Sequence, residues 1–505
     1  MSKKFGSFVL VFGICAVASV KAAYKIEATI EGAEKAKAYL ARYKGINLVN
    51  IDSAVFSKKN TVIFADAKAT LPGGLYVMRF TVAKDGDDGD SRQQQIEFIV
   101  SGQNSFKLGI SANTLNIEKS LQYTLSAENE GFKKYIDGQR RMGRKIQALQ
   151  NRYRNFQNNP DSVHSIQAQY AALMEAQKKQ VEILEVTYKG TLMATLIKCT
   201  QEPEIPEMPL PQNATNVDSI RQRQFLEFAK AHFFDNFNLA DERIVNAPML
   251  ENRMIAFFQQ LLLREPAEDI NSCINRLLDK ARQNKAVYRY ALTWLYDRYT
   301  DSPVEGHHVV GMHLCSIMSD STKVDWLTDK EKSKLKQNIR KYTLNPIGSI
   351  ATDLKLQTSD GEYRSLHALK APITILYFFN PGCGTCRMTT PALHEMYGKY
   401  REKGLEVFAV YPDKDTAAWK GYVEENGYTD WVNVWDAEGT ADIYEKYSLH
   451  AIPQLYVLDE EKKVRYKDVY IENLDSILYV IFSQIHPTTR QHEHEHEHEH
   501  EHNHN

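Results

Sequence analysis

The chain has 505 residues, of which 43% are hydrophobic and 25% charged, and a globular protein of this length is predicted to contain about three domains. The formal net charge of -2 argues against a nucleic-acid-binding protein, because such proteins carry an excess of Lys and Arg. Six cysteines are too few to hold a chain of this length together as a disulfide scaffold.

The N-terminus has the pattern of a secretory signal. Positive charges precede a short apolar run, residues 8–20, and the small residue Ala22 follows it. The run is too short to span a bilayer comfortably. Cys15 would fit a lipoprotein, but Ile14 stands before it, where lipid-modifying processing requires a small residue. We therefore expect residues 1–22 to be removed as a signal peptide and the mature protein to be periplasmic.

Residues 23–115 alternate between apolar and polar side chains in short runs. The runs from Ile26 to Ile30 and from Leu75 to Phe80 show the period of two that is typical of half-buried β-strands. Turn-forming residues such as Pro72-Gly73-Gly74 separate the runs. The region is therefore predicted to be a small antiparallel β domain.

From residue 127 to residue 342 the apolar residues recur at helical spacing. They do so on both sides of the break Asn158-Asn159-Pro160, which predicts an antiparallel helical hairpin. The recurring residues are Met142, Ile146, Leu149, Tyr153 and Phe156 before the break, and Ile166, Tyr170 and Leu173 after it. A proline-rich linker, 202–211, interrupts the region, and further amphipathic helices follow. These patterns predict an all-α domain at 127–342.

The first helix of this hairpin carries a set of basic residues that fits two interpretations. Acidic residues elsewhere in the chain balance its charge, so a solvated helix face is the simpler interpretation and a binding face is the alternative. The basic residues are Lys133, Lys134, Arg140, Arg141, Arg144 and Lys145.

A pair of cysteines lies at the junction of a predicted strand and a predicted helix. The motif Cys383-Gly384-Thr385-Cys386 follows the strand-type run 373–379 and the break 380–382, and it precedes a helical stretch, 387–403. A cysteine at a helix N-terminus is stabilised as a thiolate by free backbone N–H groups and by the helix dipole. Two intervening residues place both sulfurs on one turn, close enough to form a reducible disulfide.

Zinc ribbons use the same cysteine spacing, but a zinc site needs a second pair of ligands, and no cysteine follows Cys386. Further along the chain, Ile452-Pro453 leads into a predicted core strand, 455–458. A proline cannot donate a hydrogen bond to a strand ladder, and a cis peptide bond facing the cysteines would explain its position. We therefore interpret the pair as a redox site, with no metal and no cofactor expected.

These motifs make residues 346–487 resemble the TlpA-like thioredoxin family of extracytoplasmic thiol–disulfide oxidoreductases. Besides the cysteine pair and Ile452-Pro453, the match includes a lead-in hairpin at 352–361. Two positions depart from the family pattern, because Pro381-Gly382 replaces the usual Trp and Thr389 replaces a buried acid. The order of a β region, helices and this domain also resembles multidomain thioredoxin-like proteins of Bacteroides-type bacteria.

The resemblance implies a C-terminal α/β thioredoxin-like fold and a role for each residue of the site. Cys383 would attack a substrate disulfide, Cys386 would resolve the mixed disulfide, and Pro453 and Ile452 would present backbone groups to the substrate chain. The implied partners are protein disulfides and a membrane electron donor, and the usual direction in the family is reduction. Because Thr389 cannot ionise, the resemblance leaves open which group accepts the proton of Cys386.

Residues 488–505 are predicted to be a disordered tail because they have nothing to bury, and within this tail residues 491–505 alternate His with Glu and then Asn. Imidazoles on one side of an extended chain predict adventitious binding of Zn, Cu or Ni.

The sequence leaves two alternatives to the redox function open. One is metal handling by Cys383, Cys386 and His450 with the tail as feeder. The other makes the two N-terminal domains a binding platform that captures what the thioredoxin unit acts on.

Overall fold

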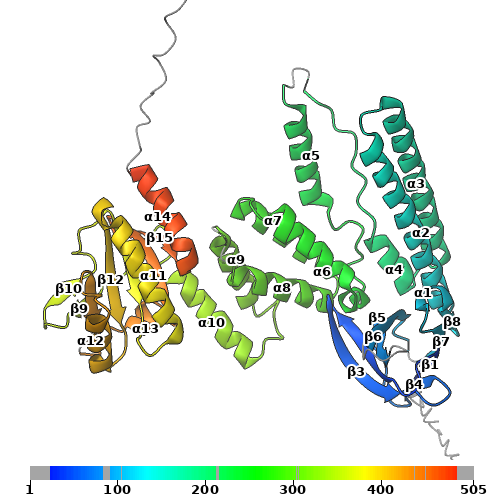
Figure 1. The fold of residues 1–505 in the computed structure, drawn as a ribbon, viewed down its shortest axis with the longest axis horizontal. Coiled ribbons are helices and arrows are strands. Elements are labelled where there is room, and N and C mark those ends of the chain that lie inside the picture. The colour runs from blue at the N-terminus through cyan, green and yellow to red at the C-terminus, as the bar shows by residue number, and fades with distance from the viewer. Residues whose placement is uncertain are drawn as a thin grey trace, which may run out of the picture. The chain divides into compact units, whose positions relative to one another are not determined.

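The computed structural model divides into two units, Met1–Val310 and Gly311–Asn505 (Figure 1). No helix in the described part of the chain has both the length and the apolar character needed to cross a bilayer. The expected signal peptide, 1–22, and the tail from residue 488 lie outside the described residues. The structure describes residues 23–83, 91–103, 105–211, 215–302, 304, 306–436, 438–449 and 451–485.

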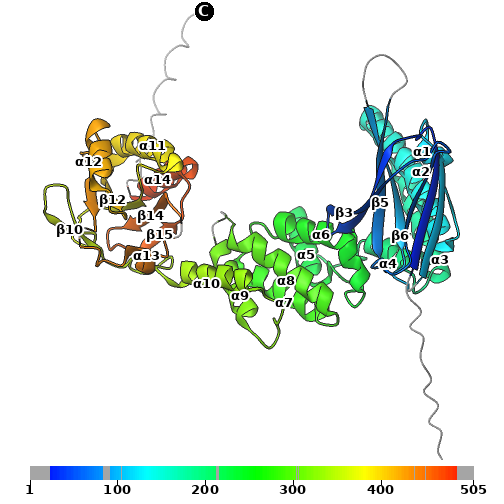
Figure 2. The same cartoon turned by 90° about the horizontal axis from the view of Figure 1, so that it is seen from below.

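The first unit begins with strands that form two sheets. They are β1 (Ala23–Glu31), β2 (Lys37–Lys44), β3 (Asn47–Val55), β4 (Thr61–Asp66), β5 (Gly74–Ala83), β6 (Ser91–Val100), β7 (Ser105–Asn113) and β8 (Gln122–Thr124). The strand orders are β4-β1-β7-β8 and β3-β2-β5-β6. Figure 2 shows these strands in blue, with β3, β5 and β6 labelled. In β4, for example, Val62 and Phe64 are buried and Ile63 between them is exposed. The inner faces of both sheets share one apolar core, so the sheets form a sandwich.

The predicted antiparallel β region is confirmed, with one difference. Every strand pair of the sandwich is antiparallel except β1 with β7, which run parallel with Ile26 opposite Leu108. An alternating run shows that a strand has one buried face, but it does not show which distant strand pairs with it or in which direction. The parallel pair therefore has no signal in the local sequence.

The predicted helical region is also confirmed, and its first two long helices form the expected antiparallel hairpin (Figure 1). These are α2 (Ala127–Phe156) and α3 (Pro160–Thr187). The side chain of Asn159 caps α3 by accepting a hydrogen bond from the Ser162 N–H at 3.0 Å, and Pro160 opens the first turn. The other helical segments are α1 (Ile117–Ser120), α4 (Leu192–Cys199), α5 (Val217–His232), η1 (Glu242–Asn246), α6 (Pro248–Met254), η2 (Ile255–Leu261), α7 (Ala267–Ala281), α8 (Lys285–Thr300), α9 (His307–Ser319) and α10 (Asp329–Thr343).

The helices of the first unit pack directly on the β sandwich. Leu75 of β5 and Ile99 of β6 contribute to an apolar core that includes α2 and α4. The Asn129 side chain of α2 exchanges two hydrogen bonds, of 2.7 and 2.8 Å, with the backbone of Ile99. The buried carboxylate of Glu251 in α6 accepts a hydrogen bond from the Ile46 N–H at 2.9 Å. Sandwich and helices therefore share a core and buried hydrogen bonds.

The second unit is built on a sheet in the strand order β10-β9-β13-β12-β11-β14-β15. The strands are β9 (Lys355–Gln357), β10 (Tyr363–Ser365), β11 (Ile373–Phe378), β12 (Leu405–Tyr411), β13 (Val432–Trp435), β14 (Gln454–Asp459) and β15 (Val464–Lys467). β12 runs parallel to β11 on one side, and β14 runs antiparallel to it on the other. The sheet is therefore mixed, with β11 in an interior position.

β11 is buried on both faces, which explains why its sequence is apolar almost throughout. Ile375 and Tyr377 belong to a core shared with α11, α12 and α14, and Leu376 and Phe378 belong to a core on the other face that includes α13. The helices are α11 (Gly384–Tyr400), the short η3 (Arg401–Lys403), α12 (Thr416–Glu425), α13 (Ile443–Lys446) and α14 (Ile471–Ile485). This mixed sheet with helices on its faces confirms the predicted thioredoxin-like fold.

Candidate active site

The cysteine pair lies where β11 ends and α11 begins. Cys383 is the N-cap residue of α11, and Cys386 follows within its first turn. Asn380 holds the connecting loop, because its backbone carbonyl accepts the Cys383 N–H at 3.0 Å and its side-chain carbonyl accepts the Gly382 N–H at 2.7 Å. The structure thus confirms the predicted sequence of strand, break and helix around the two sulfurs.

Cys383 is the more exposed of the two cysteines. Burial acts to raise the pKa of its thiol, but hydrogen bonds from Cys386 and Thr385 act in the opposite direction and prevail. The pKa of Cys383 therefore lies below its ordinary value, as expected for a sulfur at the start of a helix. A lowered pKa means that more of this sulfur is reactive thiolate near neutral pH.

Cys386 has the opposite environment. Its side chain is only 1% exposed, and burial raises the pKa of its thiol to about 12. The nearby polar side chains of Thr390 and Tyr377 are neutral: the Thr390 hydroxyl donates to the Cys386 carbonyl at 2.8 Å and lies 2.9 Å from the Tyr377 hydroxyl. The two sulfurs of the pair therefore differ chemically: the environment of Cys383 favours the thiolate, and that of Cys386 favours the protonated thiol.

The structure brings Ile452 and Pro453 to the same place. The peptide bond between them is cis, as the sequence predicts. The Cys383 thiol lies 3.4 Å from the Ile452 carbonyl oxygen and donates a hydrogen bond to it. This contact follows from the topology, because Pro453 stands directly before β14 and β14 pairs with β11, the strand that leads to the cysteines. All four residues selected from the sequence are thus found together.

The structure adds two residues to the site, Asp413 and Tyr444, that no sequence motif marks. Asp413 follows β12, and its carboxylate accepts hydrogen bonds from the side-chain amide of Asn380 and, at 3.1 Å, from the Tyr444 hydroxyl. Functional groups in α/β folds gather at the carboxyl ends of parallel strands, so an acid just after a strand was a usable signal. The sequence did not show that β12 would be the strand beside β11.

Cys199, Cys273 and Cys315 are buried in three different helices. Among the described residues, no group of three or more His, Cys, Asp and Glu side chains is arranged to hold a metal ion. His450 and the tail, which metal handling requires, lie outside the described residues. Metal handling therefore stays a hypothesis from the sequence.

A thioredoxin-like fold with a cysteine pair at the start of its first long helix defines the class of thiol–disulfide oxidoreductases. Residues 347–467 match the model of the AhpC/TSA family. Together with the relatives described next, this match shows that the C-terminal region belongs to that family as a thioredoxin-like thiol–disulfide oxidoreductase domain. Residues 167–345 match the model of a domain of unknown function, DUF5106.

The relatives come from several bacteria. Over 156 residues, 31% of this chain and 82% of the relative, the chain is 27% identical to the thiol–disulfide oxidoreductase ResA of Bacillus cereus. It is also 29% identical to the thioredoxin-like protein YneN of Bacillus subtilis over 129 residues, and this match covers 25% of this chain and 71% of YneN. A crystal structure of a thioredoxin-like protein from Bacteroides caccae is 26% identical, with a TM-score of 0.45 and coverage of 55% of this chain and 99% of that chain. The family assignment rests on the sequence matches.

Proposed function

We propose that this protein is an extracytoplasmic thiol–disulfide oxidoreductase that reduces the disulfides of other proteins through Cys383 and Cys386. The observation that supports the proposal best is the contrast between the two sulfurs. Cys383 is partly exposed with a lowered pKa, whereas Cys386 is buried with a pKa of about 12. An exposed thiolate beside a protected thiol suits a two-step disulfide exchange, in which one sulfur attacks first and the other follows.

In the first step of this reaction, the Cys383 thiolate attacks one sulfur of the substrate disulfide. A bond forms between Cys383 and that sulfur, the substrate disulfide breaks, and its other sulfur leaves as a thiolate. In the second step, Cys386 loses its proton and attacks the Cys383 sulfur, which releases the second substrate thiolate. The substrate gains two electrons and the cysteine pair loses two, so a dithiol donor, proposed to be a membrane protein, must reduce the pair again.

Ile452 and Pro453 are proposed to bind the substrate chain during this exchange. The Ile452 carbonyl oxygen lies 3.4 Å from the Cys383 sulfur, beside the position where the mixed disulfide would form. A substrate chain bonded to Cys383 must pass this carbonyl, which can accept a hydrogen bond from a backbone N–H of the substrate. Removal of residues 1–22 as a signal peptide would place the reaction in the periplasm.

The purified protein is expected to catalyse the reduction of insulin by dithiothreitol, and Cys383→Ser is expected to lower the rate to that of dithiothreitol alone. The reason is that serine keeps the shape of the side chain but supplies no thiolate. The turbidity of precipitating insulin chains measures the rate. Cys273→Ser removes a buried thiol of the first unit and should leave the rate unchanged. A wild-type rate no faster than dithiothreitol alone would refute the proposed function.

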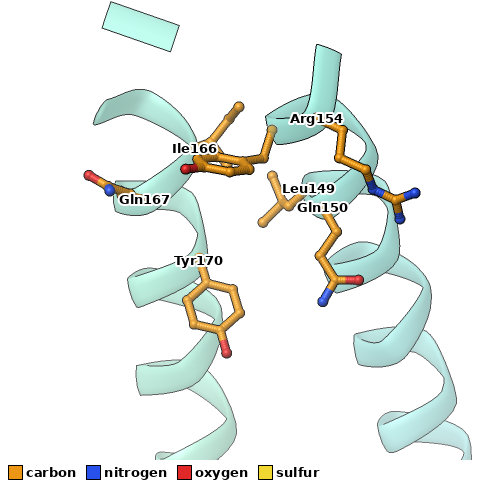
Figure 3. Close-up of a pocket in the computed structure, with 7 residues that line it drawn as sticks. Leu149, Gln150, Arg154, Ile166, Gln167 and Tyr170 are labelled. Atoms are coloured by element: carbon orange, nitrogen blue, oxygen red, sulfur yellow. The ribbon is translucent and has the colours of Figure 1, made fainter. Parts of the chain in front are cut away.

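The first unit has a second feature, which supports the binding-platform interpretation of the N-terminal regions. A cleft of about 420 Å³ opens between α2 and α3, with Leu149 and Ile166 at its base (Figure 3). The rings of Tyr153 and Tyr170 also line it and are 44% and 45% exposed. Surfaces that bind another molecule often expose aromatic rings beside buried aliphatic side chains, and this cleft has that arrangement.

The charge around this cleft indicates the chemistry of its ligand. Residues 138–156 of α2 contain six Lys and Arg and no Asp or Glu, although the whole chain has a net charge of -2. Arg154 lies at the edge of the cleft (Figure 3). We propose that the hairpin binds an acidic peptide segment with an apolar side chain, which would enter the cleft. A concave apolar site suits a side chain better than it suits a flat membrane surface.

A fluorescent Glu-rich peptide with one Phe is expected to bind the full-length protein, and Tyr170→Ala or Arg154→Glu should each weaken binding by roughly tenfold. Fluorescence anisotropy measures the affinity. Lys58→Glu makes the same charge change as Arg154→Glu on a β-sandwich turn and should have no effect. The same peptide with Ser in place of Phe should bind weakly. Equal binding of both peptides, or binding only to anionic lipid vesicles, would overturn the proposal.

A further inference from the structure

Asn380 connects the two cysteines to the rest of the second unit. Its backbone carbonyl accepts the Cys383 N–H at 3.0 Å, and its backbone acts against the burial that raises the pKa of Cys386. Its side-chain oxygen accepts the Gly382 N–H at 2.7 Å. One residue thus fixes the backbone on which both sulfurs are presented.

The side-chain amide of Asn380 is in turn oriented by Asp413. The Asn380 NH₂ group donates to one carboxylate oxygen of Asp413, and the Tyr444 hydroxyl donates to the other oxygen at 3.1 Å. The oxygen and nitrogen of an asparagine amide have nearly the same shape, so only hydrogen-bond partners decide which one points where. Because a carboxylate accepts and never donates, Asp413 allows only the orientation in which the amide oxygen faces Gly382.

We propose that Asp413 is a positioning residue for the thiol–disulfide exchange, which acts on Cys383 through the orientation of Asn380. The inference rests on the proposed function for its consequence in catalysis, but not for the geometry. Tyr444 supports the same arrangement from α13, where it is 47% exposed and its hydroxyl is bound to Asp413. With Asp413 in place, the loop 380–382 holds the start of α11 so that backbone N–H groups point at the Cys383 sulfur.

The charge of Asp413 alone would have the opposite effect on the pKa of Cys383 from the effect of positioning. If Asp413 acted on Cys383 only as a nearby negative charge, its neutralisation would favour the thiolate and lower the pKa of Cys383. If it acts by positioning, its neutralisation frees the Asn380 amide, loosens the hydrogen bonds to the sulfur, and raises that pKa. The direction of the change in Asp413→Asn therefore distinguishes the two accounts.

We expect Asp413→Asn to lower the thiolate fraction of Cys383 at pH 7 by roughly threefold to tenfold, the effect of weakening one hydrogen bond to a charged group. The ultraviolet absorbance of the thiolate, measured against pH in the full-length protein, gives this fraction. Tyr444→Phe should change it in the same direction by a smaller factor. Asp415→Asn is the matched control, since it removes a charge two positions away while asparagine still caps α12.

A double substitution tests whether the effect passes through Asn380. In the Asn380→Ala background the side chain that Asp413 orients is absent, so Asp413→Asn should no longer lower the thiolate fraction. A thiolate fraction that rises in Asp413→Asn, or that still falls in the Asn380→Ala background, would overturn the inference. The titration needs no substrate, so its result stands apart from the insulin assay that tests the proposed function.

Discussion

The Cys386→Ser variant is expected to accumulate mixed disulfides with substrate proteins, whereas the Cys383→Ser variant is expected to form none. Without Cys386, the Cys383 sulfur still attacks a substrate disulfide, but no second thiol beside it completes the exchange. Without Cys383, the remaining sulfur is buried with a pKa of about 12, which makes it a poor nucleophile near neutral pH. Non-reducing gel electrophoresis after incubation with insulin would separate the two results.

The variant with both substitutions provides the baseline for this experiment. It retains Cys199, Cys273 and Cys315, which are buried, so it should form no adducts. Equal trapping by the two single variants would contradict the roles assigned to the two sulfurs. Adducts of the double variant would instead reveal a reactive thiol outside the site.

The parts of the site that lie within short stretches of sequence could be predicted. Cys383 and Cys386 are spaced for one helical turn and follow a strand and a break, so their place at the start of a helix was visible without a structure. A proline heading a core strand predicted the cis bond between Ile452 and Pro453. These features depend on the backbone preferences of residues that are neighbours in the sequence, so a short stretch of sequence is enough to predict them.

The contacts that hold the site could not be predicted in the same way. Asn380 and Asp413 are 33 positions apart, and both are polar residues of a kind common in loops. Their contact exists because β12 lies beside β11, and that pairing depends on burying both faces of β11 rather than on a local motif. The parallel pairing of β1 with β7 escaped prediction for the same reason.

Position 389 shows how the sequence and the structure complement each other. The sequence has a threonine where the TlpA-like family that this domain resembles is expected to have a buried acid, and Thr389 is buried. The neighbouring Thr390 hydroxyl donates a hydrogen bond to the Cys386 carbonyl, and it carries no charge because a threonine hydroxyl does not ionise. Among the causes acting on the pKa of Cys386, burial is the largest, and it favours the protonated thiol.

Alkylation of the reduced, folded protein at pH 7 is expected to modify Cys383 and to spare Cys386. Iodoacetamide reacts with thiolates, and a thiol with a pKa of about 12 is ionised to a fraction of only about 10⁻⁵ at pH 7. Cys383, with its lowered pKa, keeps a larger thiolate fraction at this pH than a free cysteine does. Its alkylation should therefore fall off with acid at a lower midpoint than that of the same cysteine in the unfolded chain. Mass spectrometry of the modified peptides measures both sites at once.

Unfolding provides the control, because it removes both causes of the difference in reactivity between Cys383 and Cys386. In urea the burial of Cys386 and the helix N-terminus at Cys383 are lost, so both sulfurs should react at similar rates with the midpoint of a free thiol. The Cys386→Ser variant should keep a low midpoint for Cys383, since backbone N–H groups of Cys386 and Thr385 are among the groups that lower its pKa. Similar alkylation of the two cysteines in the folded protein would mean that the helix and the core do not separate their reactivities, and the two-step exchange would lose its physical basis.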